Sequence, residues 1–331
     1  MAIQKRTVGV IGTGNVGVAA AYAMFVQRTA SDLILLDKDQ HRAEGEALDL
    51  MHGQTFAGPT RVRVGDYADL AEAQVIIIAA GVGQRPGETR LDLMERNVAV
   101  FRAILTELDR HAPTALLVIA TNPVDVLTYV AQALSTRPPQ RIIGTGTMLD
   151  TARFRSLLGE HYGLDPRSVH AYILGEHGDT EFPVWSDARI GGLRLIGNVI
   201  NGRPYDRPAL DAIFERTRRS AYDIIERKGY TNLAIGLVIA RLVQTILNGQ
   251  RSVLPVSVRL QGEYGISGVC LSLPSIVSEN GLETSILPEL DDTELAAMHH
   301  SANVLRERIG EALPGHAEQE RKHREPGDNP A

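Results

Sequence analysis

Short runs of apolar residues recur along the first half of the chain. They are rich in Val, Ile and Leu and are bounded by glycine, proline or polar residues, so they predict buried strands. Near-continuous apolar strands are typical of a parallel sheet that is covered on both faces. The predicted strands lie at residues 7–11, 32–37, 61–64, 75–80, 115–123 and 141–146.

Helical patterns separate these strands. An alanine-rich stretch at residues 18–25 follows the first strand, and the segment HRAEGEALDLMHG at residues 41–53 follows the second. After a glycine-rich loop, apolar residues recur at three- and four-residue steps from Leu91 to Leu108, which predicts a long amphipathic helix. Strands that alternate with helices indicate an α/β fold, so we expect a Rossmann-type parallel sheet over residues 1–145.

The pattern changes after about residue 146. Strand-like segments become shorter and mixed, as at residues 169–175 and 252–258, and four long helical stretches appear. We therefore expect a second, α+β domain over residues 146–314. The tail at residues 315–331 is polar and has no apolar period, which predicts disorder. The four helical stretches lie at residues 149–163, 207–229, 233–249 and 291–313.

Composition narrows the class of protein. The 331 residues are 44% hydrophobic and 22% charged, with a formal net charge of −6, which argues against nucleic-acid binding. No apolar run approaches the roughly 20 residues that a membrane span needs. Cys270 is the only cysteine, so an internal disulfide is excluded and a reducing compartment is favoured. The chain runs straight into a strand pattern without a signal segment, so we expect a cytoplasmic protein.

A glycine fingerprint follows the first predicted strand. Gly12, Gly14 and Gly17 form G-x-G-x-x-G before a helix, and Asp37 ends the next strand. In dinucleotide-binding proteins the glycines allow a tight turn, close approach of a pyrophosphate and helix–strand packing, while the acid binds the ribose hydroxyls. A carboxylate there repels a 2′-phosphate, so the pattern predicts NAD. A glycine turn without a ligand, and a solvent-facing Asp37, are the structural alternatives.

A histidine and a carboxylate suggest acid–base chemistry. His177 lies between glycines in GEHGDT, and Asp150 and Arg153 share one face of a predicted helix. Reduction of a 2-oxo acid needs a proton donor that titrates near neutrality, a carboxylate that orients it, and a planar cation for the substrate carboxylate. Each residue also has an ordinary structural explanation, and spacing alone does not bring them together.

Six motifs in order resemble the L-lactate/L-malate dehydrogenase family over residues 7–312. They are GTGNVG, GQRPGETRLDLMERN, TNPVD, LDTARFR, GEHGDTEFPVWS and KGYTNLAIGL. The resemblance implies NAD as cofactor, a Rossmann domain followed by a substrate domain, and an active site between them. It is closest to the bacterial L-lactate dehydrogenases, which implies pyruvate and L-lactate as substrates.

The resemblance also assigns roles. His177 matches the proton donor and acceptor, Asp150 its partner, and Arg153 the clamp for the substrate carboxylate. Arg90 matches a loop arginine that polarises the carbonyl group. The remaining candidates are substrate or cofactor contacts, namely Asn122 before a proline bond that is typically cis, Thr231 and Ile235, with Asn15, Val16 and Gly81 counted among the cofactor contacts.

Gln84 lies at the position where this family distinguishes its substrates. Malate dehydrogenases carry an arginine there, which pairs with the second carboxylate of oxaloacetate. A neutral glutamine offers no such partner, and a buried unpaired charge costs about 3–5 kcal/mol. Gln84 therefore predicts preference for pyruvate, whereas its neighbour Arg85 is expected to point to solvent. Leu233 stands where lactate dehydrogenases often have tryptophan, so a larger 2-oxo acid stays open as a substrate.

Arg155 and His170 match a pair that binds fructose 1,6-bisphosphate between subunits of many bacterial lactate dehydrogenases. Two such pairs across a two-fold axis would form a four-donor cradle for a bisphosphate, so the resemblance implies an effector site and a homotetramer. The alternative is an ordinary surface arginine beside an inert histidine.

Other functions remain alternatives. A malate dehydrogenase or a broader 2-hydroxy-acid dehydrogenase is the nearest one. A non-catalytic NAD-binding protein is less favoured, because His177, Arg90 and Arg153 are all retained. We predict no metal site, because the adjacent His299 and His300 lie on a helix, where neighbouring side chains point apart.

Overall fold

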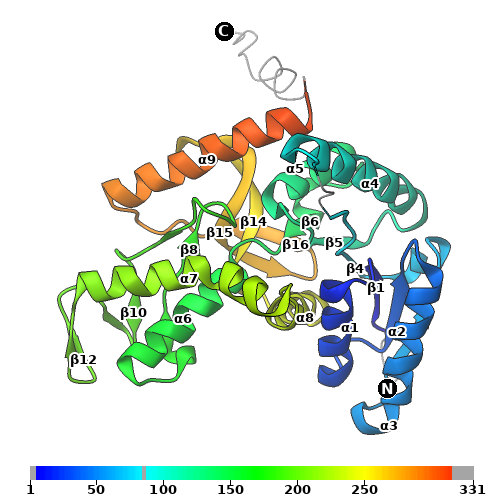
Figure 1. The fold of residues 1–331 in the computed structure, drawn as a ribbon, viewed down its shortest axis with the longest axis horizontal. Helices are drawn as coiled ribbons and strands as arrows, with labels where there is room; N and C mark the ends of the chain where they lie inside the picture. Colours follow the sequence, from blue (N-terminus) through cyan, green and yellow to red (C-terminus); the bar gives the residue numbers. More distant parts are fainter. Residues whose placement is uncertain (1–4, 84–86, 315–331) are drawn as a thin grey trace, which may run out of the picture.

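The structure, a computed structural model, describes residues 5–83 and 87–314. Within them, nine strands form one sheet in the order β16-β15-β14-β6-β5-β4-β1-β2-β3 (Figure 1). The last six in this order are parallel, as predicted. They are β1 Thr7–Ile11, β2 Asp32–Leu36, β3 Arg61–Val64, β4 Val75–Ile78, β5 Leu116–Ile119 and β6 Ile142–Gly144.

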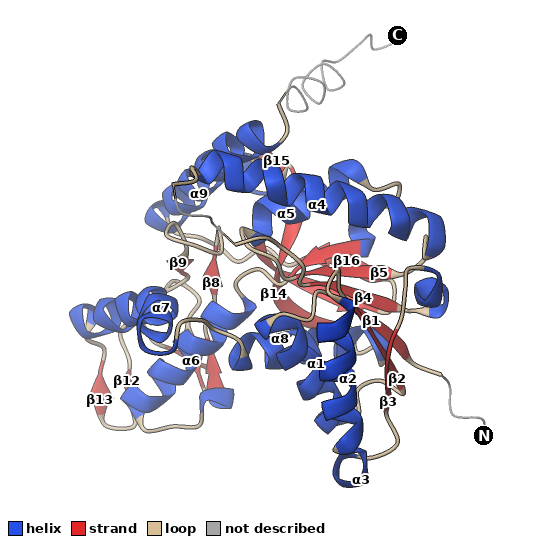
Figure 2. Cartoon of the chain, turned by 45° about the vertical axis from the view of Figure 1, so that its right-hand side comes forward, coloured by secondary structure: helices blue, strands red, loops and turns tan. Residues whose placement is uncertain are grey.

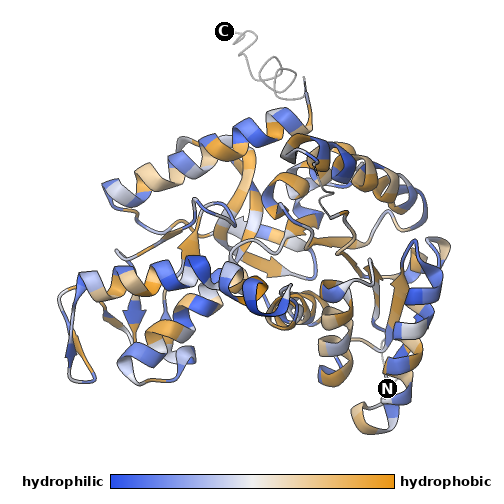
Figure 3. Cartoon of the chain, viewed as in Figure 1, coloured by the Kyte–Doolittle hydropathy of each residue, from blue (hydrophilic) through white to orange (hydrophobic). Residues whose placement is uncertain are grey.

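The centre of the parallel sheet is the core of the molecule. Every residue of β1, β2, β4 and β5 is buried, and Val10 of β1 pairs with Leu35 on one side and Ile77 on the other. Figure 3 shows these strands largely in the hydrophobic colour, while the outer helices alternate between hydrophobic and hydrophilic. Burial on both faces explains why the strands read as continuous apolar runs rather than alternating ones.

Helices cover both faces of this sheet. Figure 2 shows α4 and α5 on one face and α1 and α8 on the other. Thr89 and Asp92 form a capping box at the start of α4, in which each side chain binds the other residue's backbone amide. The helices of the first half are α1 Asn15–Gln27, α2 Gln40–His52, α3 Gln54–Ala57, α4 Arg90–His111 and α5 Val124–Leu134.

The second half of the chain adds three antiparallel strands to the same sheet. They are β14 Ser252–Gln261, β15 Ser267–Ser278 and β16 Gly281–Ser285. β14 joins the parallel part through the pair Ser257 and Gly144 of β6. The sheet therefore continues across the predicted boundary between residues 145 and 146, and that division into two domains stays a prediction.

A second apolar cluster lies away from the sheet, under α6 and α7. Phe154 and Trp185 meet there edge to face, with ring centroids 5.1 Å apart. The segment at residues 169–175 forms two short strands rather than one. The elements of this half are the helices α6 Met148–Tyr162, α7 Arg207–Lys228, α8 Leu233–Leu247 and α9 Asp292–Ala312 and the short strands β7 Val169–His170, β8 Ile173–Leu174, β9 Phe182–Pro183, β10 Arg189–Ile190, β11 Leu193–Arg194, β12 Val199–Ile200 and β13 Arg203–Pro204.

The two halves also meet where α8 packs against α1 (Figures 1 and 2). A Cβ atom on Gly236 of α8 would lie 2.7 Å from the backbone carbon of Ala19, so only glycine permits this approach. The contact brings the start of α8 to the side of the sheet that carries the glycine fingerprint. It therefore places Thr231 and Ile235 in the same region as α1.

Four 3-10 turns complete the described elements, η1 Ala68–Glu72, η2 Pro139–Arg141, η3 Pro166–Ser168 and η4 Glu263–Gly265. None of the described helices is both long enough and apolar enough to span a membrane. The tail at residues 315–331, which was predicted to be disordered, lies outside the described residues.

Candidate active site

The predicted cofactor residues gather at one edge of the sheet. Gly12 follows β1, Asp37 follows β2, Gly81 follows β4 and Asn122 lies three residues after β5. Because these strands are parallel, all four positions lie at their carboxyl ends. Ligands of open α/β sheets bind at this edge.

The glycines of the fingerprint have separate tasks. Gly12 has a φ of 97°, and a Cβ atom there would lie 2.5 Å from the amide nitrogen of Ala80. A Cβ atom on Gly17 would lie 1.9 Å from the carbonyl oxygen of Gly12, so glycine lets α1 approach the loop after β1. Around Gly14 no atom lies within 4 Å of the same test position, which leaves space for a ligand.

The start of α1 fits an anionic group. Gly14 is the N-cap residue and has no side chain to bind the first-turn amides, and no acidic residue lies in that turn. Asn15, the first helical residue, is exposed, and Val16 is half-buried. Unbound amides and the positive end of the helix dipole suit a pyrophosphate, so these residues fit a dinucleotide.

Asp37 links the glycine loop to the second strand. Its Oδ2 accepts hydrogen bonds from the backbone amide and the hydroxyl of Thr13, at 2.6 and 3.0 Å, and its Oδ1 accepts one from the amide of Asp39 at 3.0 Å. Burial works to raise the pKa of Asp37, but these hydrogen bonds and nearby Arg42 lower it. The carboxylate is thus ionised and held in place. Sequence reasoning missed Thr13, which the fingerprint leaves unspecified.

A hollow of about 600 Å³ adjoins Asp37. It lies between the ends of β2 and β3 and is lined in part by Gln40, Val64 and Tyr67. The hollow lies next to the glycine loop along the carboxyl edge of the sheet. A nucleoside bound to Asp37 would have space there.

His177 and Asp150 meet in space. Nδ1 of His177 lies 2.6 Å from Oδ2 of Asp150, across 27 residues of sequence. Asp150 lies on α6 and is 3% exposed, whereas the His177 side chain is 24% exposed and so is accessible from one side. The pair has the geometry of an imidazole that is oriented by a buried carboxylate.

Arg153 completes this group. Its Nη1 donates to Oδ1 of Asp150 at 3.0 Å, as expected for residues three apart on a helix. A third acid, Glu181, lies close enough that ligand atoms of Asp150, His177 and Glu181 are all within 4.8 Å of one another. Both oxygens of Asp150 are engaged by nitrogen atoms of His177 and Arg153, which favours a proton over a metal ion here.

His177 and Asp150 each stabilise the charged form of the other. Burial alone would lower the pKa of His177, but the negative charge of Asp150, the hydrogen bond to it and two further acids raise it to about 9. Burial likewise works to raise the pKa of Asp150, but the charge and hydrogen bond of His177, with Arg153, lower it. The favoured state is imidazolium beside carboxylate.

A buried acid holds the backbone of His177. Oδ2 of Asp125 accepts a hydrogen bond from the His177 amide at 2.7 Å, and Oδ1 accepts one from the Ser257 hydroxyl. Burial raises the pKa of Asp125 to about 6, although both hydrogen bonds oppose the shift. The motif TNPVD contains this residue, but its sequence position gave no indication that it would contact His177.

Helix α9 fastens the same loop from the other side. The Ser301 hydroxyl accepts a hydrogen bond from the amide of Glu176 at 3.0 Å, and Arg308 donates to the buried carboxylate of Glu176. Thr180 also donates to Glu176 at 2.5 Å. Sequence reasoning missed Ser301 and Arg308, because their partner Glu176 lies more than 100 positions away.

The other predicted substrate and cofactor residues lie around this edge. Asn122 is exposed and precedes a cis bond to Pro123. Thr231 is half-buried just before α8, and Ile235 is half-buried on it and packs against the main core. Arg90 begins α4, and its side chain lies outside the described part of the structure, as do Gln84 and Arg85.

Arg155 of α6 binds the backbone next to His170. Nε of Arg155 donates to the carbonyl oxygen of Ala171 at 2.8 Å, and its guanidinium lies over the ring of Tyr172 at 4.9 Å. His170 is exposed on β7, where it pairs with Arg189 of β10. Half-buried Arg155 therefore contacts the residue that follows exposed His170.

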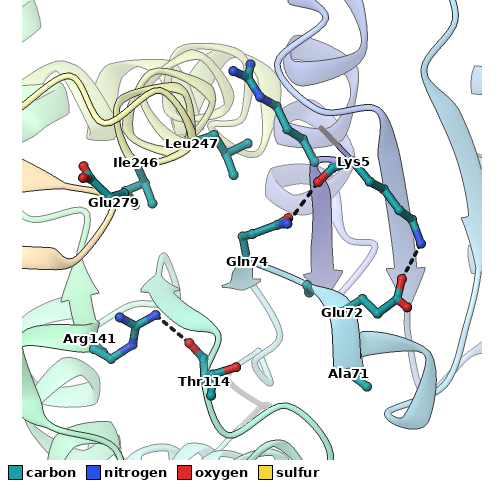
Figure 4. Close-up of a pocket in the computed structure, with 11 residues that line it drawn as sticks. Lys5, Ala71, Glu72, Gln74, Thr114, Arg141, Ile246, Leu247 and Glu279 are labelled. Atoms are coloured by element: carbon teal, nitrogen blue, oxygen red, sulfur yellow. Dashed lines mark hydrogen bonds and ion pairs between the residues drawn. The ribbon is translucent and has the colours of Figure 1, made fainter. Parts of the chain in front are cut away.

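A second hollow, of about 320 Å³, lies at the opposite edge of the sheet (Figure 4). Gln74, Thr114 and Arg141 line it where β4, β5 and β6 begin. Several of its polar groups bind one another. Gln74 donates to the carbonyl oxygen of Lys5 at 3.1 Å, Arg141 donates to that of Thr114 at 2.5 Å, and Lys5 pairs with Glu72. None of the described residues that were predicted to act on a ligand lines this hollow.

Comparisons with known proteins agree with this geometry. Residues 6–144 match the family model for the lactate/malate dehydrogenase NAD-binding domain, and residues 147–314 match the model for the lactate/malate dehydrogenase α/β C-terminal domain. Together the two models account for nearly all of the described chain.

Three similar proteins are described as L-lactate dehydrogenases. An L-lactate dehydrogenase of Salinibacter ruber is 58% identical over 306 residues, covering 92% of this chain and 97% of that protein. One of Priestia megaterium is 46% identical over 304 residues, covering 92% and 96%. The solved structure of a minor L-lactate dehydrogenase from Enterococcus mundtii superposes with a TM-score of 0.91 at 40% identity, covering 94% of this chain and 99% of that one.

Proposed function

Because this chain belongs to the lactate/malate dehydrogenase family, we propose that it interconverts pyruvate and L-lactate with NAD as cofactor. The observation that carries the proposal is the His177–Asp150 contact at 2.6 Å, in a loop beside the carboxyl edge of a Rossmann sheet. The two bacterial relatives named above match more than nine tenths of this chain, and both are L-lactate dehydrogenases. This favours pyruvate over oxaloacetate as the substrate.

His177 supplies the proton. When bound, NADH provides the hydride that is added to the carbonyl carbon of pyruvate. The imidazolium of His177 donates its Nε2 proton to the carbonyl oxygen, because Nδ1 is engaged with Asp150. The hydroxyl group of lactate forms, His177 becomes neutral, and the proton returns from solvent after product release. In the reverse direction neutral His177 accepts the hydroxyl proton.

Asp150 orients His177, and Arg153 is assigned to the substrate carboxylate. Asp150 fixes the tautomer and orientation of His177 and stabilises its positive charge. Arg153 gives one donor nitrogen to Asp150, and its remaining donors can bind the substrate carboxylate in a planar, bidentate contact. We assign Arg90 to polarisation of the carbonyl oxygen, on the strength of its place at the start of α4 after the glycine-rich loop.

The cofactor is assigned to the glycine loop and its neighbours. Gly12, Gly14, Gly17 and the first turn of α1 would bind the pyrophosphate, and Asp37 the ribose hydroxyls. The fixed negative charge of Asp37 disfavours a 2′-phosphate, so NAD is preferred to NADP. The remaining candidates on this edge are Asn15, Val16, Gly81, Asn122, Thr231 and Ile235.

One assay tests the proposal. Purified protein is given NADH with pyruvate or with oxaloacetate, and NADH oxidation is followed at equal substrate concentrations. We expect pyruvate to be preferred by about two orders of magnitude or more, because Gln84 leaves the second carboxylate of oxaloacetate unpaired. Equal kcat/KM for pyruvate and oxaloacetate would contradict the assignment of pyruvate as the substrate. Only the membership in the lactate/malate dehydrogenase family would then stand.

We also propose an effector site at Arg155 and His170. Its support is that Arg155 of α6 contacts the residue that follows exposed His170 of β7. Two copies facing each other across a two-fold axis would bind a bisphosphate and so require at least a dimer. We propose a homotetramer on the resemblance alone. Pyruvate saturation curves should shift to lower concentration with fructose 1,6-bisphosphate, and Arg155→Gln should remove the shift. Identical curves with and without the effector would refute the site.

A cytoplasmic location belongs to the same proposal. Cys270 is a buried thiol, so the one cysteine of the chain is free rather than bonded, which suits a reducing compartment. Fractionation of the native cells, with activity measured in each fraction, tests it.

A further inference from the structure

Glu181 is a third acid beside the catalytic pair. It lies four residues after His177, is 6% exposed, and has a carboxyl oxygen within 4.8 Å of ligand atoms of both His177 and Asp150. Asp150 is hydrogen-bonded through both oxygens. Oε1 of Glu181, in contrast, is buried and has no hydrogen-bond partner within the described residues. A buried carboxylate without such partners is strongly disfavoured, whereas a carboxylic acid is tolerated.

Among the described residues, no arginine, lysine or histidine forms an ion pair with Glu181. Arg153 donates to Asp150, and Arg218 of α7 donates to Glu215 at 2.8 Å. Burial, followed by the negative charge of Asp150, raises the pKa of Glu181 well above its ordinary value, and the positive charges of His177, Arg153 and Arg218 only partly offset this. Burial and the charge of Asp150 thus both favour the neutral acid form of Glu181.

We propose that Glu181 holds a proton in the active site and that the 2-oxo acid binds only while this proton is retained. The inference rests on the proposed function and concerns its substrate-binding step. With Glu181 neutral, ionised Asp150 is the one negative charge beside imidazolium His177 and Arg153, and the substrate carboxylate is attracted to these cations. If Glu181 ionises, an unpaired negative charge lies beside the pocket and repels the substrate carboxylate.

The decline of kcat/KM at alkaline pH shows whether pyruvate binding and reduction require one protonated group or two. If both His177 and Glu181 must be protonated, kcat/KM for pyruvate falls about 100-fold per pH unit above both pKa values, against about 10-fold for His177 alone. Asp125 does not add to the slope, since its pKa of about 6 leaves it ionised there.

Glu181→Gln mimics the protonated acid permanently. We expect this variant to lose the steeper part of the alkaline decline, mainly because its KM for pyruvate no longer rises with the loss of a second proton. Glu160→Gln is the matched control, because it removes the same charge from an exposed side chain on α6. It should retain the slope of the unmodified protein. An unmodified protein that declines only 10-fold per pH unit, like Glu181→Gln, would overturn the proposal.

A second measurement needs no variant. Oxamate, a monoanionic pyruvate analogue, is titrated into the NADH-bound protein by calorimetry in buffers of different ionisation enthalpy, which counts the protons taken up on binding. Above the pKa values of both groups we expect an uptake that approaches two protons, and Glu181→Gln should give one. An uptake of no more than one proton throughout contradicts the inference. Failure of the proposed function is separate, because it would show as absence of pyruvate reduction at pH 7.

Discussion

The backbone amide of His177 donates to Oδ2 of Asp125 at 2.7 Å, so the first turn of α5 fixes the loop that carries the imidazole. The other oxygen of Asp125 is bound by Ser257 of β14. Asp125 thus joins a helix of the first half to a strand and a loop of the second. Positioning of the catalytic group and cohesion of the two halves depend on the same buried side chain.

Replacing Asp125 should therefore affect stability strongly. Asp125→Ala leaves the His177 amide and the Ser257 hydroxyl without their acceptor, and we expect a loss of about 2–4 kcal/mol in the free energy of unfolding. Ser257→Ala removes one partner only and should cost about 1 kcal/mol. Urea unfolding measures both, and equal losses in the two variants would contradict this assignment.

The raised pKa of His177 predicts the pH dependence of the reaction. Pyruvate reduction requires imidazolium, so its kcat/KM should be level at neutral pH and fall through about pH 9. Lactate oxidation requires the neutral ring and should rise over the same interval. The folded-state pKa lies above the unfolded value of 6.5. The pair therefore stabilises the fold fully below pH 6.5, and this contribution is lost as the pH rises through 9.

Asp150→Asn tests the origin of that shift. Without the carboxylate, burial of His177 dominates, and the decline in pyruvate reduction should move to lower pH. We expect kcat/KM at pH 7 to fall at least about 100-fold, which is the usual contribution of an oriented acid–base group. Steady-state rates from pH 5 to 10 give both quantities. An unshifted profile would show that Asp150 does not set the charge of His177.

The close contact between Gly17 and Gly12 predicts that a methyl group added at residue 17 weakens NADH binding. Gly17→Ala places a Cβ atom 1.9 Å from the Gly12 carbonyl oxygen, so α1 must move and NADH affinity should fall at least about tenfold. Gly45→Ala is the control, because it lies in α2 with no atom within 4 Å of the new Cβ. It should be neutral or stabilise by about 0.5–1 kcal/mol. Fluorescence titration with NADH and thermal melts measure the two effects.

Asp37 allows its structural and binding roles to be separated. Asp37→Ser removes the charge and most of the contact to Thr13, and NADH affinity should fall while discrimination against NADPH is reduced. Asp37→Asn can still accept the Thr13 amide hydrogen bond but is uncharged, so it should lose the discrimination with less effect on NADH. Unchanged NADH affinity in Asp37→Ser would count against the ribose assignment.

Gln84→Arg should move substrate preference towards oxaloacetate. The added guanidinium would pair with the second carboxylate, and this gain corresponds to about two to four orders of magnitude in relative kcat/KM. Arg85→Gln changes the adjacent position and should leave the preference unaltered. A strong preference for pyruvate in Gln84→Arg would show that another residue selects the substrate.

Much of the fold could be predicted from the sequence because the parallel strands are buried on both faces. The predicted strands at residues 7–11 and 61–64 coincide with β1 and β3. In contrast, β15 was missed, because buried serines at residues 272, 275 and 278 interrupt its apolar residues and because it contains Pro274. Its partners lie on β14 and β16, and no local pattern specifies that pairing.

The site could be predicted only in part. Motifs located His177, Asp150 and Arg153, and the structure brings them together. The supporting residues could not be found in this way, since Asp125 and Ser301 act through backbone amides of a distant loop. Their residue types are common, and their role depends entirely on where the chain folds back.

The pairing of β14 with β6 has a consequence for cutting this chain into parts. A fragment that ends at residue 145 would keep all six parallel strands but would leave the backbone of β6 without its neighbour. Such an uncovered edge is a template for adding strands from other molecules. Isolated nucleotide-binding halves should therefore self-associate into aggregates unless the segment that supplies β14 accompanies them.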